Sequence, residues 1–237
     1  MTQVTINLYQ GMSHQCSYLA DQVACMHVVV PLFNITPGHY GLLLESGFRR
    51  SGDMVYRPGC QACDACIPAR IRVDSFRPNR SQRRTRKKNL DIVIRSRNAE
   101  LDEQHLGLYR AYLASRHADG EMSADTIADM RRFLISDWCE TILIEGWLGE
   151  RLVLSAVTDV VDNALSALYT YFDPDLPDRS LGTLGILEQI EACRSLGFRY
   201  LYLGYWIESC RKMSYKSSFQ ALETRDPEGH WSLLRKQ

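Results

Sequence analysis

No apolar run in this 237-residue chain approaches the ~20 residues that a membrane-spanning helix needs. The first residues, "MTQVTINLYQGM", lack the basic start and apolar core of a secretory signal. We therefore expect a cytoplasmic protein that does not enter a membrane. Because structural disulfides are rare in that compartment, the eight cysteines are expected to be thiols, metal ligands or core residues.

The sequence also lacks internal repeats, low-complexity segments and the H-x-E and P-C-x-x-C motifs of a zinc nucleobase deaminase. Hydrophobic residues make up 45% and charged residues 24%, which are ordinary values for a soluble globular protein. The length fits one large domain or two modest ones.

Net charge is absent too, since 28 basic residues balance 28 acidic ones, but the charge is unevenly placed. Between residues 74 and 97 there are nine basic and only two acidic residues, so the remainder of the chain has a net charge of −7. Such a block indicates one anionic partner docking at one place, and the alternative is a solvated basic helix. The basic residues are Arg77, Arg80, Arg83, Arg84, Arg86, Lys87, Lys88, Arg95 and Arg97.

Apolar periodicity and turn signals predict a mixed chain of helices and strands. Helices are predicted at 38–46, 81–89, 102–117, 123–136 with Ser123 as N-cap, 181–195 and 208–215. Strands are predicted at "ARIRVDSF", "LDIVIRS", "TILIEGWL", "RLVLSAVTDVV", "ALSALYTYF", "RYLYLGYW" and near 218–222, with a hairpin around residues 51–53.

The order of elements from about residue 140 onward is similar to the core of the GNAT acyltransferase fold. In that fold a glycine-bearing loop opens a helix whose free N–H groups face an anion. Here Arg179 and Gly182 occupy such a loop, although bulky Leu184 replaces a small residue. The predicted fold class is α+β. A GNAT-like core, mostly antiparallel sheet flanked by helices, is joined to a small cysteine-containing N-terminal subdomain. The predicted boundaries are 1–75 for that subdomain, 76–136 for a basic helical segment and 137–237 for the transferase domain.

Four segments carry a resemblance that covers nearly the whole chain. They are "CSYL" at Cys16, "YRPGCQACDACIPARI", "YTYFDPDLPDRSLGT" and "YLGYWIESCRKMSYKSSFQALE". As a set they resemble the arginyl-tRNA–protein transferase family, most closely its bacterial aspartate/glutamate leucyltransferase branch. The most specific piece is "CRKMSYK" at 210–216, close to a C-x-K-M-x-Y-K signature.

The resemblance implies transfer of leucine from leucyl-tRNA to the N-terminal α-amine of proteins that begin with Asp or Glu, which marks them for N-end-rule degradation. It implies no cofactor for the transfer itself. It also gives the basic block a reason, because phosphates of a tRNA acceptor stem need Lys and Arg contacts. We expect the tRNA-binding residues to be Arg77, Arg80, Arg83, Arg84, Arg86, Lys87 and Lys88.

The chemistry needs an amine placed beside an ester and donors for an oxyanion. An α-amine with a reference pKa of ~7.7–8.0 is partly neutral at cytosolic pH, so no Ser or Cys nucleophile is required. The candidate catalytic residues are Asp173, Arg179, Gly182, Lys212 and Tyr215. The candidate substrate-binding residues are Tyr169, Tyr171, Tyr205, Trp206, Cys210 and Lys216. Arg179, Lys212 and Lys216 are the candidates for the acceptor carboxylate, each with a surface charge as the alternative. For Tyr169 and Tyr171 the alternative is a place in the core.

Cys60, Cys63 and Cys66 stand at a strict three-residue interval, which allows two or three thiolates to meet one ion. With Cys16 as the fourth ligand, suggested by its counterpart in the family, they could hold zinc or an iron–sulfur cluster. Cys25, His14 and His27 are other candidates. The alternative is a set of small reduced side chains that shape a tight turn.

Two departures from the family pattern stand out. Ala20 occupies a position after the first cysteine motif where a proline and an arginine are usual. Glu208-Ser209 and Gln220-Ala221 replace the usual Pro-Gly and Arg-Pro, which puts substrate preference in doubt more than reaction type. The rival functions are an acyl-coenzyme A-dependent GNAT N-acyltransferase, which Leu184 disfavours, and a non-catalytic tRNA-binding module.

Overall fold

The computed structural model describes residues 6–30, 35–116 and 125–234. Its N-terminal part contains a four-stranded antiparallel sheet in the order β1-β4-β6-β5 and a two-stranded ribbon of β2 and β3. The strands are β1 (Asn7–Gln10), β2 (His14–Gln15), β3 (Val23–Ala24), β4 (Met26–Val30), β5 (Arg49–Ser51) and β6 (Met54–Pro58). The sequence predicted the β5–β6 hairpin, whereas β1 to β4 were not predicted.

The main sheet has eight strands in the order β14-β13-β7-β12-β11-β10-β9-β8. All its neighbouring strands in the described residues are antiparallel except β11 and β12. The strands are β7 (Ile67–Arg72), β8 (Val93–Asn98), β9 (Thr141–Leu148), β10 (Arg151–Val161), β11 (Ala164–Phe172), β12 (Tyr200–Trp206), β13 (Leu222–Arg225) and β14 (Trp231–Leu233). The predicted mostly antiparallel α+β architecture is confirmed. The sheet draws strands from all three predicted segments.

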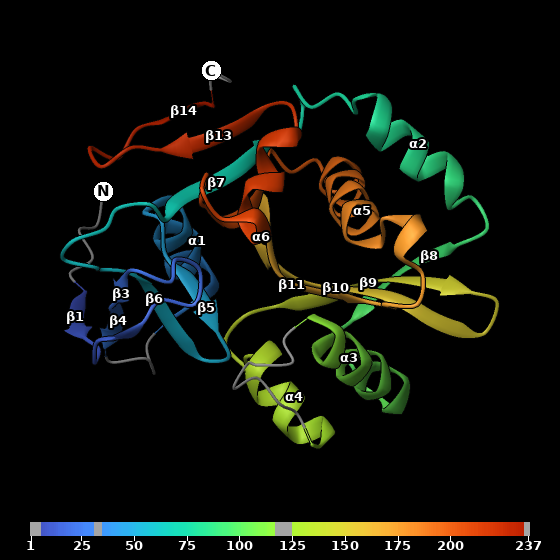
Figure 1. Ribbon diagram of the computed structural model, residues 1–237, viewed down its shortest axis with the longest axis horizontal. Coiled ribbons are helices and arrows are strands. Elements are labelled where there is room, and N and C mark those ends of the chain that lie inside the picture. The colour runs from blue at the N-terminus through green and yellow to red at the C-terminus, as the bar shows by residue number, and fades with distance from the viewer. Residues whose placement is uncertain (1–5, 31–34, 117–124, 235–237) are drawn as a thin grey trace.

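Helices cover both faces of this sheet (Figure 1). On one side α5 (Leu181–Ser195) packs against β10 and β11, with α2 (Arg80–Lys88) against its outer side. On the other side lie α3 (Glu103–Arg116) and α4 (Ile127–Leu134). The remaining helices are α1 (Pro37–Glu45), α6 (Arg211–Ser214) and the 3-10 turns η2 (Pro177–Arg179) and η3 (Tyr215–Ser218). Within the described ranges, no helix combines the length and apolar character that crossing a membrane requires.

Local sequence explains most helix boundaries. The Thr36 side chain caps α1 by accepting from the His39 N–H, and Gly47 follows the helix with a φ of +85°. Asn79 and Gln82 form a reciprocal capping box at the start of α2. These helices and α5 lie where the sequence predicts them.

Several predicted boundaries near the ends of elements are wrong. The helix predicted at 208–215 begins only at Arg211, and the strand predicted at 69–76 runs from Ile67 to Arg72. Thr126 caps α4, because its hydroxyl accepts from the Asp129 N–H at 3.1 Å, so the helix starts later than predicted. The predicted cap, Ser123, lies outside the described residues. The strand predicted near 218–222 begins only at Leu222, because η3 continues to Ser218 and Ala221 turns the chain with a φ of +56°.

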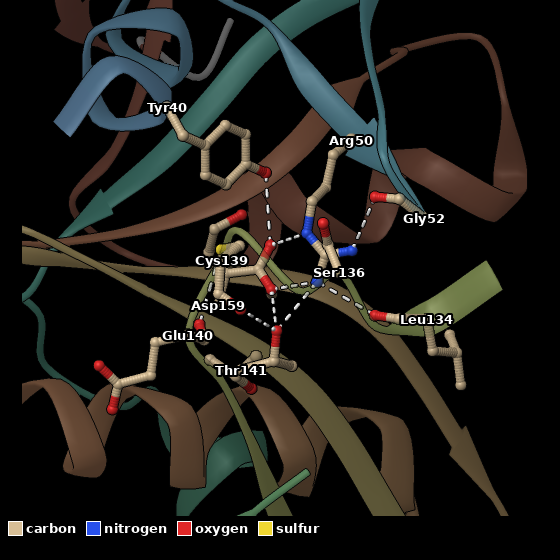
Figure 2. Close-up of polar contacts among 12 residues, drawn as sticks. Tyr40, Arg50, Gly52, Leu134, Ser136, Cys139, Glu140, Thr141 and Asp159 are labelled. Atoms are coloured by element: carbon tan, nitrogen blue, oxygen red, sulfur yellow. Dashed lines mark hydrogen bonds and ion pairs between the residues drawn. The ribbon is translucent and has the colours of Figure 1, made fainter. Parts of the chain in front are cut away.

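A buried ion pair fastens the N-terminal hairpin to the main sheet (Figure 2). Arg50 on β5 donates from Nε to Asp159 Oδ2 on β10 at 2.8 Å and from Nη2 to the other carboxylate oxygen. Its remaining donors reach the carbonyls of Gly52 and Leu134 and the hydroxyl of Thr141. Burial opposes the charge, but Asp159 outweighs it and raises the pKa of Arg50. The two sheets are therefore fixed to each other through a fully paired charge.

Candidate active site

The two parallel strands of the main sheet separate after a short contact. β11 and β12 pair over three residues, ending at Ser166 and Tyr202. Each strand carries an irregularity just beyond that point: the β10–β11 register shifts between Ala167 and Tyr169, and the β12–β7 register shifts between Tyr202 and Gly204. Such bulges bend strands and re-aim side chains. We call the space between residues 167–172 of β11 and 203–206 of β12 the wedge.

The edges of the wedge are partly open to solvent. Residues 164–166 of β11 are buried, whereas 167–170 are half-buried, and Gly204 and Tyr205 of β12 are half-buried as well. Backbone groups facing a gap between parallel strands have no neighbouring strand to pair with. On these two edges the Ala167 and Tyr205 carbonyls accept hydrogen bonds from side chains instead of from a neighbouring strand.

Arg49 on β5 reaches into the wedge. It donates from Nη1 to Ser166 Oγ at 2.9 Å and from Nη2 to the Ala167 carbonyl at 2.5 Å. A Cβ on Gly204 would lie 3.3 Å from Arg49 Nε, and the φ of Gly204 is +76°. Gly204 thus serves twice, by adopting a left-handed backbone and by leaving room for the guanidinium.

Lys216 reaches the same place from η3. Its ammonium donates to the Tyr205 carbonyl on β12 and lies 3.4 Å from Met213 Sδ. Only 5% of the residue is exposed. Burial, reinforced by the charge of Arg49, lowers the pKa of Lys216 to about 7. The predicted substrate-binding lysine is therefore buried beside a second cation.

The N-terminal cysteines lie close to the "CRKMSYK" segment. Burial raises the pKa of Cys66 to about 12, and neighbouring Cys16, Cys60, Cys63 and Cys210 contribute. The four proposed ligands thus share one neighbourhood. Among the described residues, however, no three His, Cys, Asp or Glu side chains are placed so that they could share a metal ion. The Cys60 thiol is instead 3.4 Å from the Cys25 backbone nitrogen.

The two predicted aromatic residues on β11, Tyr169 and Tyr171, differ in their burial. Tyr171 is fully buried, 5.4 Å from the Tyr109 ring between centroids. Tyr169 packs edge-on against Tyr109, Tyr112 and Phe133 at 5.6–6.2 Å. Tyr169 belongs to the half-buried part of β11, whereas Tyr171, two residues later, is buried. Tyr171 is therefore a core residue in this structure and Tyr169 borders the wedge.

On β12, Tyr205 and Trp206 differ in their exposure. The Tyr205 hydroxyl donates to the Gly47 carbonyl at 2.9 Å, and the residue is half-buried at the wedge. Trp206 is 6% exposed and packs in the cluster under α5. In the signature, Cys210 is buried, whereas Lys212 and Tyr215 are exposed. The structure thus brings Tyr205, Cys210 and Lys216 together with Arg49.

The loop before α5 is occupied by structural contacts. Arg179 forms a two-pronged ion pair with Asp91 at 2.7 and 2.9 Å. Asp173 pairs with Arg151 at 2.7 Å and accepts from the Asp175 N–H. A Cβ on Gly182 would lie 3.0 Å from the Phe172 ring, so the glycine lets α5 approach β11.

Leu184 points into the core, with only 3% of the residue exposed, in the cluster formed by α5 and β10. Its bulk would not crowd a phosphate at the start of the helix. The expectation that Leu184 disfavours acyl-coenzyme A is therefore wrong.

Most of the basic block lies on and just before α2, whereas Arg95 and Arg97 lie on β8. Arg86 faces inward and pairs with Glu191 on α5 at 2.8 Å, and Lys88 donates to the Asp178 carbonyl. Arg83 and Arg77 bond to nearby backbone carbonyls. The exposed members of the block on and before α2 are Arg77, Arg80, Arg83, Arg84, Lys87 and Lys88. Figure 1 places this helix on the α5 side of the sheet.

Sequence reasoning missed Arg49 and Gly204. The signal for Gly204 was a glycine inside an aromatic strand, "YLYLGYW", which indicates a bulge or a close approach. Arg49 could be noticed only as one of two adjacent arginines before a tight turn. Its role depends on contacts with β11, which follows more than 110 residues later.

Comparison with known proteins gives matches over most of the chain. Residues 14–84 match the family model described as arginine-tRNA-protein transferase, N terminus, and residues 104–226 match the C-terminal model of the same family. An aspartate/glutamate leucyltransferase of Alcanivorax borkumensis is 45% identical, covering 92% of this chain and 90% of that protein. One from Thiobacillus denitrificans is 43% identical, covering 97% and 95%.

Among solved structures, the chain is similar to the C-terminal domain of a protein assigned as a lysylphosphatidylglycerol synthetase from Agrobacterium fabrum. The TM-score is 0.49 at 12% identity, covering 73% of this chain and 53% of that one. At this level the likeness does not identify a function.

Proposed function

Because this chain belongs to the arginine-tRNA–protein transferase family, we propose that it transfers leucine from leucyl-tRNA to the α-amine of proteins that begin with Asp or Glu. The observation that carries the proposal is the identity of 43–45% to aspartate/glutamate leucyltransferases over at least nine-tenths of the chain. The modified protein would then be a substrate for N-end-rule degradation.

The reaction is an aminolysis. The nitrogen of the neutral α-amine attacks the ester carbonyl carbon of leucyl-tRNA, the bond to the ribose oxygen breaks and an amide forms. The amine gives up a proton and the ribose hydroxyl gains one. Placing the two reactants side by side supplies much of the acceleration, so neither a thiol nucleophile nor a cofactor is needed.

The wedge supports this chemistry by its position and polarity. The opened edges of β11 and β12 offer backbone groups to the leucyl ester, and Tyr169 and Tyr205 border it. The order β9-β10-β11-α5-β12, with parallel β11 and β12 diverging, also supports a GNAT-like core. Lys212 and Tyr215 stay candidates for contact with substrate because they are exposed beside Lys216. Asp173 and Arg179 stay candidates that would first have to leave their present partners, and Gly182 stays a candidate through its place at the start of α5.

The tRNA would lie along α2. Exposed Arg80, Arg84 and Lys87 make the outer side of this helix strongly basic, which suits the phosphates of an acceptor stem. Arg86 holds the helix against α5.

The N-terminal cysteines stay a proposed site for zinc or an iron–sulfur cluster. Their gathering near Cys66 supports it, but the thiols would have to converge further to act as ligands. No step of the transfer depends on such a group. Elemental analysis of anaerobically purified protein tests the site. Iron or zinc at one equivalent or more supports it, and the absence of both metals contradicts it.

One assay tests the proposed function. The protein is incubated with leucyl-, phenylalanyl- or arginyl-tRNA and with peptides that begin with Asp, Glu, Arg or Ala, and products are identified by mass. We expect leucine on the Asp and Glu peptides. Absence of leucine from both would refute the proposal.

A further inference from the structure

Three arginines are buried in the described residues, and one of them differs from the others. Arg50 is paired with Asp159, and Arg70 is paired with Glu223 and Glu45. Arg49 is 8% exposed, yet its bonds go to a hydroxyl and a backbone carbonyl. Across the described ranges, no acidic side chain forms an ion pair with it.

Lys216 repeats the pattern a short distance away. It is 5% exposed, it donates to a carbonyl and a thioether, and it too has no acidic partner among the residues described. The two cations affect each other, because Arg49 helps to lower the pKa of Lys216. Charges that are removed from water are ordinarily paired with an opposite charge. Two neighbouring buried cations that lack an acidic partner are therefore a candidate binding site for an anion.

The position of the pair shows from where an anion would arrive. Arg49 is anchored to β11 at Ser166 and Ala167, where the parallel pairing ends, and Lys216 is anchored to β12 at Tyr205. Because Arg49 also lies beside Gly204 of β12, it stands between the two strands, and Lys216 stands at the β12 edge, where both strands become partly open to solvent. An anion entering the wedge would meet both.

A guanidinium held by two contacts suits a carboxylate, because its planar fork matches the two oxygens. A carboxylate on a short side chain can accept from the guanidinium fork and from the ammonium at once, which suits this pair of donors.

We propose that Arg49 and Lys216 form the specificity subsite that binds the side-chain carboxylate of the acceptor's first residue. The inference rests on the proposed function, since that function supplies an acceptor beginning with Asp or Glu. It assigns acceptor selection to a residue of the N-terminal hairpin. The same carboxylate would neutralise two buried charges, so an amide or alkyl side chain in its place leaves them unpaired.

Calorimetric binding of two peptides that differ only in their first residue, Asp or Asn, tests the subsite without tRNA. A hydrogen bond to a charged group corresponds to roughly a 10- to 100-fold change in affinity, so wild type should bind the Asp peptide tighter by about that factor. Arg49→Gln should reduce the difference to about threefold or less, mainly by weakening the Asp peptide. Arg49→Lys should keep part of it. Arg131→Gln, on the exposed face of α4, is the matched control.

Lys216→Met gives a second variant, in case Arg49→Gln does not fold, and should reduce the discrimination in the same direction. The proposed subsite is refuted if wild type does not bind the Asp peptide more tightly than the Asn peptide. It is also refuted if both folded variants keep the full preference for the Asp peptide. Leucyl transfer is measured separately. A wild type that binds through Arg49 but transfers nothing would refute the proposed function and leave the subsite standing. A wild type that transfers leucine without Arg49-dependent discrimination would refute only the subsite.

Discussion

Arg49 and Arg50 are neighbours on one short strand, yet they occupy opposite kinds of environment. Arg50 meets Asp159 and satisfies its donors with a hydroxyl and two carbonyls, as Figure 2 shows. Arg49 points to the wedge and meets no carboxylate in the described residues. Successive side chains of a strand face opposite sides, so one arginine fastens two sheets and the other faces the opened strands. We therefore assign the paired charge of Arg50 to stabilising the fold and propose that the unpaired charge of Arg49 binds a ligand.

Substitutions in the buried Arg50–Asp159 ion pair should have the largest effect on the free energy of unfolding. Asp159→Asn leaves Arg50 buried without its counter-charge, and removal of one partner of a buried pair costs about 3–5 kcal/mol. Since a domain is stable by only ~5–15 kcal/mol, we expect a much lower free energy of unfolding in urea. Asp137→Asn, in an exposed pair with Arg131, is the control and should change it by less than about 1 kcal/mol. Equal effects of the two substitutions would contradict the assignment of Arg50.

Removal of the unpaired cation Lys216 should instead raise the free energy of unfolding. Lys216→Met replaces a buried cation that has no acidic partner among the described residues, so we expect stability to rise by about 1–2 kcal/mol near pH 6 while binding of acidic peptides falls. Urea unfolding and calorimetry measure the two effects. A loss of stability equal to that of Asp159→Asn would show that Lys216 serves the fold.

The stability of the protein should depend on pH through the same lysine. Burial lowers the pKa of Lys216 to about 7, below its ordinary value of ~10.4, so between these pH values the unfolded chain binds more protons than the folded one. The free energy of unfolding of wild type should therefore rise with pH across this window. The difference by which it falls below that of Lys216→Met should become smaller. Unfolding measured at pH 6, 8 and 10 checks this, and a constant difference would contradict it.

The preference for Asp over Asn should weaken as pH rises above about 7, because Lys216 then loses the charge that attracts the carboxylate. The groups around the Lys216 ammonium are Arg49, the Tyr205 carbonyl, Met213, Cys210 and Cys66. Arg49 stays charged throughout, so part of the preference should persist. Calorimetry with the two peptides at pH 6 and 9 measures the change, and an unchanged ratio would argue against Lys216.

A third kind of cation, exposed and solvated, should show the smallest effect per residue. Replacing Arg80, Arg84 or Lys87 on α2 by Gln should weaken tRNA binding modestly and lower the salt-dependence slope by roughly 0.7–0.9 for each phosphate that the variant no longer neutralises. Filter binding across a salt series measures the slope. Arg132→Gln on α4 is the control. Unchanged slopes for all three α2 variants would remove this helix from the tRNA interface.

The sequence was sufficient to predict the elements whose signals are local. Thr36-Pro37 and Gly47 located α1, and apolar β-branched runs separated by turn signals located the strands β9 to β11. The "CRKMSYK" segment pointed to the family, and the comparisons confirmed it. These successes share a cause, since capping residues, β-branched runs and turn signals act within a few residues.

The features that could not be predicted depend on contacts between distant segments. Arg179 was expected to be available for an anion, but the α2–β8 connection places Asp91 against it. Tyr171 alternates like a wedge residue, yet α3 covers it with Tyr109. Arg49 meets Ser166 only because β5 crosses beside the parallel pair. Each outcome is set by tertiary packing, which a one-dimensional pattern does not contain.

Selection of the acidic acceptor by an unpaired arginine in the wedge can be tested by competition in one tube. The mixture holds leucyl-tRNA, an Asp peptide and the matching Asn peptide, with either wild type or Arg49→Gln. We expect leucine almost entirely on the Asp peptide with wild type, and a slower, nearly equal distribution with the variant. An undiminished preference for the Asp peptide in the variant would contradict the role of Arg49.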